Sequence, residues 1–500
     1  MRRILIIGGG IAGLASAFKV KRAADLGHEV DFLLVEKDPR LGGKILTEIV
    51  PDPAGDGRFI VDGGPDCFLT EKPACHRMAK LTGIFDDELP TDDSRRKTWI
   101  LSRGRLHALP DGVMMFAPTK FIPFVTTGLF SWPGKIRMGM EFFIPPKKIK
   151  PGELNDETLE SFVVRRMGRE CLDRLAEPLV GGIHASDPAK MSLAATFPRL
   201  LEMEQKYGSL LKGFLAVRRM VEEMRRKYPP KPGQKPRTFF TSFVNGMQQL
   251  TDRMAEVAGR QKMRTGLAAL ALHRLARDRW AVQLSDGSTI EADGVILATE
   301  SWAAEPLIRP HDEAIADALK AIPWSSSATV SFAFRESEVG FDLNAFGVLC
   351  PLVERRSLLA ATYSSTKWPG RAPKGKVLIR GFVGGPHNQE VVTLSDEELV
   401  RLVHREFCEI IGLDPKARPL FTRVYRWPLG MPQYILGHLQ RVELIEKRSA
   451  EIKGLALAGG SYRGVGLPNC VESGEKAVSK ILNEWGIDLA EDHIEEKRYY

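Results

Sequence analysis

After its first two residues the sequence reads Arg3-Ile4-Leu5-Ile6-Ile7-Gly8-Gly9-Gly10-Ile11-Ala12-Gly13. The apolar run predicts a buried strand, the glycines predict a tight turn, and the residues from Leu14 to Ala24 predict a helix. A dinucleotide-binding fingerprint has this order, because Gly8 permits the turn, Gly10 lets the backbone approach a pyrophosphate and Gly13 lets the helix pack closely. Phosphates bind at such a helix N-terminus, where unpaired N–H groups and the helix dipole favour negative charge. The alternative is a glycine turn that only packs a helix on a strand.

An acidic residue follows at the spacing that this fingerprint requires. A second apolar run, Val30–Val35, ends at Glu36, about 20 residues beyond Gly13. A carboxylate at this position accepts a hydrogen bond from a ribose 2′-hydroxyl and repels a 2′-phosphate. The pattern therefore predicts an α/β nucleotide-binding domain and disfavours NADP as its ligand.

Length and composition are typical of a globular protein with more than one domain. The chain has 500 residues, of which 43% are hydrophobic and 27% charged, and its formal net charge is +8. The anionic partners of a basic protein are nucleic acids, membrane surfaces and acidic small molecules. Because the sequence contains neither a nucleic-acid-binding signature nor a basic helix with interleaved aromatic residues, we expect no nucleic-acid partner.

The six cysteines are widely spaced, and none forms a Cys-x-x-Cys pair. This spacing predicts reduced thiols in a cytoplasmic protein, with neither a disulfide framework nor a metal site. The N-terminus is a strand with its glycine turn rather than a charged leader, so we expect no signal peptide. No run reaches the ~18 consecutive apolar residues of a spanning helix.

Residues 111–147 form an apolar, aromatic-rich region. Its apolar runs are Val113–Phe116, Phe121–Val125, Leu129–Trp132 and Met138–Ile144. The flanking cations are Lys120, Lys135, Arg137, Lys147, Lys148 and Lys150. Short amphipathic helices with cationic edges lie in membrane interfaces. The other interpretation is a helical subdomain whose apolar side chains form the wall of a pocket, and the two interpretations are compatible.

Nucleotide-type features recur far apart in the chain, which predicts a discontinuous domain. We expect a hairpin around Asp52–Gly57, a helix over Gln248–Ala258, a buried strand over Gly294–Thr299 and a final helix from about Ser473 to Trp485. Residues 324–425 alternate strand and turn signals, which predicts a second, mostly antiparallel sheet. We expect the nucleotide domain to consist of three parts, residues 1–97, 238–303 and 431–490. Residues 98–227 are expected to form a helical, membrane-associating and substrate-contacting region, and residues 304–430 a substrate-binding sheet domain. Residues 229–237 are expected to be a linker.

Several motifs carry a resemblance to known families. Glu36, Leu41-Gly42-Gly43-Lys44 and Val61-Asp62-Gly63-Gly64-Pro65 resemble the FAD-binding start of the amine oxidase and phytoene desaturase superfamily. Four longer segments narrow the resemblance to the protoporphyrinogen oxidase family, which includes oxidases of coproporphyrinogen. These segments are 177–188, 245–250, 427–438 and 458–470. The resemblance implies a discontinuous Rossmann-like FAD-binding domain combined with a mixed α+β substrate domain and a helical domain.

The resemblance also implies the residues that contact FAD. These are Gly8, Gly9, Gly10, Ile11, Ala12, Gly13, Glu36, Lys37, Gly42, Gly43, Lys44, Gly63, Gly64, Pro65, Asp66, Cys67, Ala268, Gly460, Val465, Gly466 and Leu467. The last group precedes a helix whose N-terminus is expected to face the flavin pyrimidine, where reduced flavin carries negative charge.

The implied reaction removes six electrons from a porphyrinogen, with O2 as acceptor and H2O2 as product, in heme biosynthesis. It needs neither a side-chain nucleophile nor a metal, so we name no catalytic residue. Plant members carry an arginine directly before an aromatic-Ile pair, whereas Thr98 precedes Trp99-Ile100 here. Arg96 and Lys97 are therefore the candidate partners of a substrate carboxylate, and a solvated cationic cluster is the alternative.

Three alternatives remain open at this level. The protein could be another flavoprotein of the superfamily that acts on amines or carotenoid precursors. It could be a flavin-free binding protein, like the Rab escort proteins of the same fold, although the intact glycine motifs and Glu36 argue against this. The sequence does not distinguish protoporphyrinogen from coproporphyrinogen, and it leaves open whether the protein forms a homodimer or touches a membrane.

Overall fold

The computed structural model describes residues 1–150, 152, 154–228 and 238–489. The expected linker, 229–237, lies outside these residues. The first sheet is parallel and has the strand order β12-β2-β1-β16-β22. Its strands are β1 (Arg2–Ile7), β2 (Val30–Glu36), β12 (Met263–Thr265), β16 (Gly294–Leu297) and β22 (Leu455–Leu457). They come from three distant parts of the chain, which confirms the predicted discontinuous nucleotide-type domain.

The alternating side chains of β1 supply two separate cores. Ile4 and Ile6 pack under α1 (Ile11–Asp25), α2 (Pro73–Leu81), α11 (Gln248–Ala258) and α17 (Leu467–Glu484). Leu5 and Ile7 point to the other face. That face is covered by the antiparallel strands β13 (Ala269–Arg274), β14 (Trp280–Leu284) and β15 (Thr289–Ala292) and by α12 (Ser301–Ile308), α13 (Glu313–Lys320) and α16 (His438–Ala450). A strand buried on both faces explains the uninterrupted apolar run at the N-terminus.

The second sheet has seven strands in the order β21-β17-β20-β19-β18-β7-β8. They are β7 (Thr98–Ser102), β8 (Arg105–Ala108), β17 (Trp324–Arg335), β18 (Gly347–Leu349), β19 (Leu358–Tyr363), β20 (Lys376–Gly384) and β21 (Phe421–Pro432). Every neighbouring pair is antiparallel except β7 and β18, so the predicted antiparallel sheet is confirmed. The helix α15 (Asp396–Ile411) packs on one face. The hairpin of β3 (Thr47–Pro51) and β4 (Arg58–Asp62) packs on the other face.

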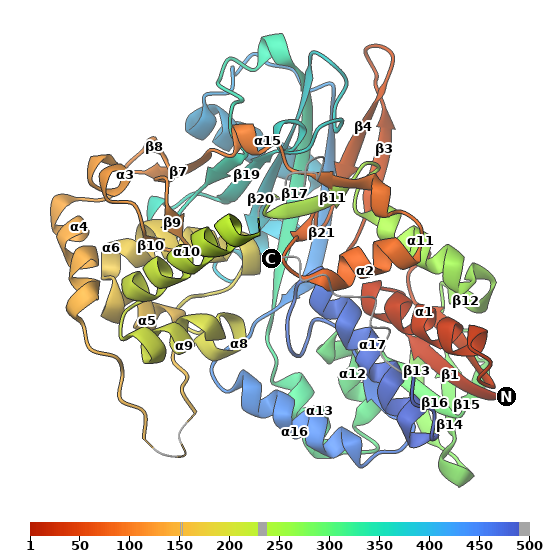
Figure 1. Cartoon of the computed structure of the whole chain (residues 1–500). Coiled ribbons are helices and arrows are strands. Elements are labelled where there is room, and N and C mark those ends of the chain that lie inside the picture. The colour runs from red at the N-terminus through yellow and green to blue at the C-terminus, as the bar shows by residue number, and fades with distance from the viewer. Residues whose placement is uncertain (151, 153, 229–237, 490–500) are drawn as a thin grey trace.

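A helical region completes the molecule and lies opposite the nucleotide-type domain in Figure 1. Its helices include α3 (Phe121–Thr126), α4 (Trp132–Gly139), α5 (Leu159–Arg166), α7 (Glu177–His184), α9 (Pro198–Tyr207) and α10 (Leu210–Lys227). Their core also takes in Ile100 of β7, whose neighbours Trp99 and Leu101 point to the α15 side of the sheet. The face of the large sheet that carries Ile100 therefore looks toward the helical region.

Local predictions agree with the structure except at two helix starts. The first helix begins at Ile11, three residues before the predicted Leu14. The hairpin tip at Asp52–Gly57 and the helix Gln248–Ala258 are confirmed. The final helix begins at Leu467, not near Ser473, so the predicted start was wrong. Pro468 lies in the first turn, where proline is tolerated because its missing N–H would have no helical partner. Gly466 and Pro468 thus begin a helix where their residue types suggested a loop.

Candidate cofactor site

Two glycine motifs meet at the carboxyl end of β1. The amide of Gly42 donates to the Gly9 carbonyl at 2.8 Å. A Cβ atom added to Gly43 would stand 3.1 Å from the Cα of Gly10, so the second loop crosses directly over the first. At Gly13 an added Cβ would lie 1.9 Å from the Gly8 carbonyl oxygen, which explains why only glycine fits there.

Glu36 lies beside this crossing. Its carboxylate accepts hydrogen bonds from the Gly9 amide at 2.5 Å and the Asp38 amide at 2.9 Å, and the residue is buried. The backbone carbonyl of Glu36 accepts from Leu267 at 2.9 Å, which brings the following residue, Ala268, to the same edge of the sheet. The structure therefore brings together three expected contacts that are far apart in the sequence.

Two helix N-termini open onto the same region. Gly10 is the N-cap of α1 and Gly466 is the N-cap of α17. Neither helix has a side-chain cap or an acidic residue in its first turn, so no side chain of either helix neutralises the N–H groups at its own N-terminus. The helices cross closely, because the Ser16 hydroxyl donates to the Gly474 carbonyl at 3.0 Å. This arrangement suits an anionic group such as a pyrophosphate.

The Gly63–Cys67 loop is held against the second sheet. The Gly63 carbonyl accepts hydrogen bonds from the Thr329 hydroxyl at 2.9 Å and the Trp427 indole at 3.0 Å. A Cβ at Gly64 would stand 1.9 Å from the Lys44 carbonyl oxygen, so this loop crosses the segment that follows the second glycine motif. The Lys44 ammonium itself pairs with Glu300. The loop therefore joins the nucleotide-type domain to the large sheet.

The Gly460–Gly466 segment is held from one side by Tyr434, which follows β21, and by His438, the first residue of α16. The Tyr434 hydroxyl donates to the Gly460 carbonyl at 2.7 Å and accepts from the Gly464 amide at 2.9 Å. His438 is fully buried and bonds the Tyr462 carbonyl through Nε2 at 2.7 Å. Burial lowers the pKa of His438 to about 4, so the ring is neutral at pH 7 and its role is structural.

The residues that line this region fit a flavin dinucleotide. A Cβ at Gly10 would meet no atom within 4 Å, which leaves open space above the first turn of α1. The buried Thr299 hydroxyl, directly after the strand beside Gly8, has no hydrogen-bond partner among the described residues. An acidic residue for a ribose, the uncapped end of α1 for phosphates, the uncapped end of α17 for the flavin pyrimidine and a glycine loop for a flat ring match the parts of FAD.

The candidate carboxylate partners are exposed and lie next to aromatic rings. The Lys97 ammonium is 3.7 Å from the centre of the Trp99 ring, and the Arg96 guanidinium is 5.8 Å from that of Phe239. Trp99 points to the α15 side of the sheet, so the Lys97 ammonium is drawn away from the face of Ile100. Within the described residues, neither cation forms a hydrogen bond or an ion pair with the glycine loops.

Sequence reasoning missed the buried cations beside the Gly63–Cys67 loop. Arg380 donates to the carbonyls of Asp62 at 2.6 Å and Gly64 at 2.8 Å, and Lys367 pairs with Asp66 at 3.2 Å. Both cations lie more than 300 residues after the loop, and one is in the middle of a strand. No local pattern marks them, because only the packing of the large sheet brings them here.

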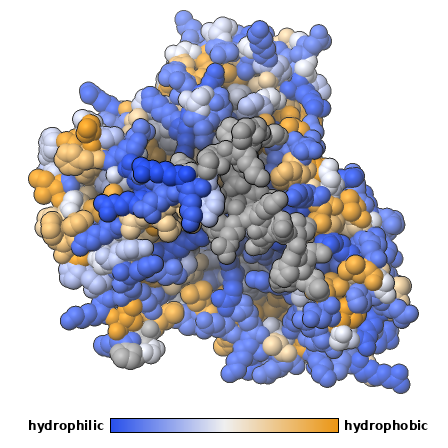
Figure 2. All heavy atoms as spheres, in the orientation of Figure 1, coloured by the Kyte–Doolittle hydropathy of each residue, from blue (hydrophilic) through white to orange (hydrophobic). Residues whose placement is uncertain are grey.

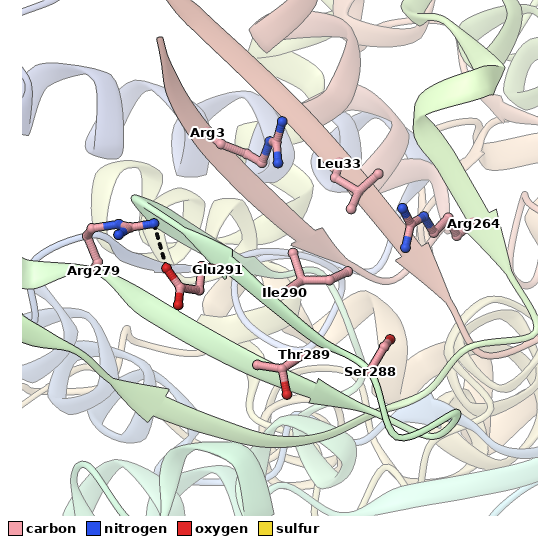
Figure 3. Close-up of a pocket in the computed structure, with 8 residues that line it drawn as sticks. All are labelled: Arg3, Leu33, Arg264, Arg279, Ser288, Thr289, Ile290 and Glu291. Atoms are coloured by element: carbon pink, nitrogen blue, oxygen red, sulfur yellow. Dashed lines mark ion pairs between the residues drawn. The ribbon is translucent and has the colours of Figure 1, made fainter.

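The molecule also has a pocket near the amino end of β1. A surface pocket of about 400 Å³ is lined by Arg3, Leu33, Arg264, Arg279, Ser288, Thr289, Ile290 and Glu291 (Figure 3). Arg3 is at the start of β1, whereas the glycine loop follows its end, roughly 15–20 Å away along the strand. Arg279 is already paired with Glu291 at 2.9 Å, as Figure 3 shows. This pocket is therefore separate from the cofactor site.

Comparisons with known proteins agree with this geometry. The family model of flavin containing amine oxidoreductases matches residues 11–482. The solved structure of a protein from Exiguobacterium sp. 255-15 is 29% identical, with a TM-score of 0.82 over 97% of this chain and 99% of its own. A reduced UDP-galactopyranose mutase shares the fold at 17% identity, with a TM-score of 0.69 over 97% of this chain and 96% of its own.

The chain belongs to the family of flavin-containing amine oxidoreductases. It is thus a flavoprotein oxidoreductase with FAD as its cofactor. Among its relatives, the coproporphyrinogen III oxidase of Bacillus subtilis is 34% identical over 96% of this chain and 98% of the relative. The chloroplastic protoporphyrinogen oxidase of Oryza sativa is 30% identical over 95% of this chain and 87% of the relative. The resemblance to the protoporphyrinogen oxidase family is confirmed.

Proposed function

We propose that this protein is an FAD-dependent oxidase that converts a porphyrinogen into the porphyrin in heme biosynthesis. The reaction removes six electrons, uses O2 as acceptor and releases H2O2. The observation that carries the proposal is the 34% identity to a coproporphyrinogen III oxidase along nearly the full length of both chains. The test is porphyrin fluorescence over time, in air, with each chemically reduced porphyrinogen offered to the purified protein.

The residues of this chain position the two reactants rather than react with them. Bound FAD supplies the two-electron chemistry and the reaction with O2. We propose that FAD is held by the glycine motifs, Glu36, Lys37, Lys44, Ala268, the 63–67 loop and the 460–467 segment. Thr329 and Trp427 fix the Gly63 carbonyl and with it the loop against which the flavin ring would rest. The porphyrinogen would lie along the sheet face of Ile100, between that loop and the helical region.

Among the porphyrinogens we place coproporphyrinogen III first and protoporphyrinogen second. The former carries two additional carboxylates, which suit a protein with a net charge of +8. Relatives from Bacillus subtilis and Staphylococcus aureus, at 34% and 30% identity, are named coproporphyrinogen III oxidases. A ratio of kcat/KM values above one for coproporphyrinogen over protoporphyrinogen supports this order, and the inverse ratio reverses it.

We propose that Arg96 and Lys97 attract the substrate carboxylates by long-range electrostatic steering rather than by direct contact, because the Lys97 ammonium lies on the side of the sheet away from Ile100. Both side chains are exposed. Their segment adjoins the cofactor loop, because the Asp92 amide donates to the carbonyl of Lys367, which itself pairs with Asp66. Replacing both residues by alanine should raise KM and leave kcat unchanged, since they would act on binding alone. Unchanged KM values would assign them to a solvated cluster.

The rival functions predict different measurements. A flavin-free binding protein would purify colourless and would not take up FAD. An amine or carotenoid oxidase would be yellow but would not accelerate porphyrinogen oxidation. The uncapped helix ends and the orphaned Thr299 hydroxyl favour a flavin-loaded protein over the binding role.

We also propose that the helical region contacts an anionic membrane surface from the cytoplasmic side. Phe143 and Phe121 are 82% and 79% exposed, and Ile122, Trp132 and Ile136 are exposed beside them. Figure 2 shows apolar residues gathered on the edge formed by this region. Lys120, Lys147 and Lys148 supply exposed or half-exposed cations near this apolar patch. An exposed apolar patch with a cationic rim is typical of peripheral membrane proteins.

The base of this patch is rigid. The buried Glu141 carboxylate accepts from the Ser209 hydroxyl at 2.6 Å and the Leu210 amide at 2.8 Å and pairs with buried Arg166. These bonds fix the short helix Met140–Phe143 at the start of α10. No helix of the described residues is long and apolar enough to cross a bilayer. Contact would therefore be made by the surface of the folded region.

Sedimentation with vesicles tests the membrane proposal. The protein should bind vesicles that contain phosphatidylglycerol, and the variant F121S/F143S should lose this binding. The matched control is Leu270→Ser, because Leu270 is also exposed but lies on β13 in the nucleotide-type domain. Equal binding by the two variants would contradict the proposal. If the parent protein is a dimer that binds no vesicles, and F121S/F143S is a monomer, then the patch is a homodimer interface instead.

A further inference from the structure

A buried group of charged side chains lies directly behind the Gly63–Cys67 loop. The Asp66 carboxylate is 3.2 Å from the Lys367 ammonium and 3.4 Å from the Arg380 guanidinium. It also accepts a hydrogen bond from the Trp368 indole at 3.0 Å. Arg380 is only 3% exposed and donates to two backbone carbonyls of the loop. The cations of this group therefore contact the loop both through the Asp66 side chain and through backbone carbonyl groups.

Cations outnumber carboxylates in this group. The other buried carboxylate, Asp62, is matched by Arg371 at 3.2 Å. Among the described residues, ionic contacts thus join three cations, Arg371, Lys367 and Arg380, to two carboxylates. Burial and the Asp66 charge raise the pKa of the neighbouring Cys67 thiol to about 12, so Cys67 is neutral. Protonation of Asp62 would only enlarge the cationic excess.

The ionised states follow from the contacts. Burial by itself disfavours ionisation of Asp66, but Lys367 and Arg380 outweigh it and hold the pKa of Asp66 well below its usual range. Burial also disfavours a charged Lys367, yet Asp66 more than compensates, so the pKa of Lys367 is raised. Asp66 and Lys367 are therefore both charged at pH 7. Arg380 remains a second cation on the same carboxylate.

A buried, unmatched charge is costly in a folded protein unless a partner neutralises it. The Arg380 Nε has no hydrogen-bond partner among the described residues, so the group is not fully satisfied internally. We propose that the excess positive charge of the group formed by Asp66, Lys367 and Arg380 stabilises negative charge on the reduced flavin at the Gly63–Cys67 loop and so raises its reduction potential. This inference rests on the placement of FAD proposed above. Reduction of bound FAD by hydride transfer would add two electrons and one proton and leave one negative charge, which this excess charge would balance.

Charge-changing variants of the flavin-loaded protein test the inference by sign. Lys367→Met removes the excess cation, so the midpoint potential should fall and the dissociation constant of the flavin–sulfite adduct should rise about tenfold. A tenfold change is the effect expected of one unit charge ~10 Å from the flavin at an effective dielectric constant of about 20. Asp66→Asn removes a carboxylate, so it should raise the midpoint potential and lower the dissociation constant of the flavin–sulfite adduct. The double variant keeps the parent charge and should return close to the parent values.

Matched controls separate this electrostatic role from a structural one. Lys374→Met removes an exposed cation from the following turn and should leave the potential unchanged. Lys367→Arg keeps the charge and should retain the parent potential. Shifts of the same sign in K367M and D66N, or no shift in either, would overturn the inference. If K367M does not fold, D66N alone decides it, because the predicted rise in potential is specific to charge. A parent protein that binds no flavin would instead overturn the proposed function.

Discussion

Gly474 of α17 lies against the backbone of Ala12 in the first turn of α1. A Cβ atom added to Gly474 would stand 2.1 Å from the Ala12 carbonyl oxygen. This contact joins the first turn of α1 to the third turn of α17. Because neither N-terminus is capped by a side chain, the close crossing fixes the relative positions of two helix ends that carry unpaired N–H groups in the proposed FAD site.

Gly474→Ala should therefore damage both stability and cofactor retention. The new methyl group would push α17 away from α1, at a cost of about 1–3 kcal/mol, and would separate the two helix ends. Chemical denaturation and the flavin content of the purified protein measure the two effects. Gly139→Ala is the control, because a Cβ at this helical position meets nothing within 4 Å. Equal stability and flavin content in the two variants would refute this account of the crossing.

Glu36→Gln should weaken FAD binding about tenfold or more. A glutamine can still accept from the Gly9 amide, but the charge-assisted hydrogen bond to a ribose hydroxyl is lost. FAD fluorescence quenching during titration of flavin-stripped protein gives the dissociation constant. Glu29→Gln changes an exposed glutamate just before β2 and should bind FAD like the parent. Equal affinity of E36Q and E29Q would show that Glu36 does not contact the cofactor.

Glu177 should make stability depend on pH. Burial raises the pKa of this carboxyl to about 7 from an ordinary value of 4.5, although the Leu352 amide, which donates to it at 2.9 Å, partly opposes the shift. Because the folded state holds this proton more tightly than the unfolded state, the contribution of Glu177 to stability is largest below pH 4.5 and is lost as the pH rises to about 7. The total loss is about 3 kcal/mol.

Glu177→Gln should remove this part of the pH dependence, because the amide has no proton to lose in this range. The measurement is the free energy of unfolding between pH 5 and pH 8 for the parent, E177Q and the control E202Q. Glu202 is exposed, so E202Q should follow the parent curve. If the curve of E177Q also follows that of the parent, a group other than Glu177 causes the pH dependence of stability.

Glu141→Gln should destabilise the helical region strongly. It removes the nearer of the two buried carboxylates that pair with Arg166 and leaves only Glu204, at 3.4 Å, and breaking a buried pair costs up to about 3–5 kcal/mol. Glu160→Gln breaks a more exposed pair with Arg169 in the same region and should cost less than about 1 kcal/mol. Thermal unfolding of the two variants is the measurement. Similar losses would mean that the buried pair does not hold the base of the apolar patch.

Sequence patterns predicted the parts of the site that depend on local geometry. Gly8, Gly10 and Glu36 were predictable because a tight turn, a close backbone approach and a strand end each restrict the residue type. The early start of α17 was missed, since glycine and proline signal both loops and helix starts. Lys367 and Arg380 were beyond prediction, because their positions depend on strand pairing in the large sheet and on its packing against the Gly63–Cys67 loop.

The central claim is tested most directly by the stoichiometry of the reaction in air. The flavin-loaded protein is mixed with chemically reduced coproporphyrinogen III or protoporphyrinogen, and porphyrin and H2O2 are measured together. The account predicts porphyrin formation well above the uncatalysed rate, with three H2O2 released for each porphyrin. No enhancement with either substrate, in protein that carries its flavin, would contradict the assignment and leave an oxidase of a different substrate.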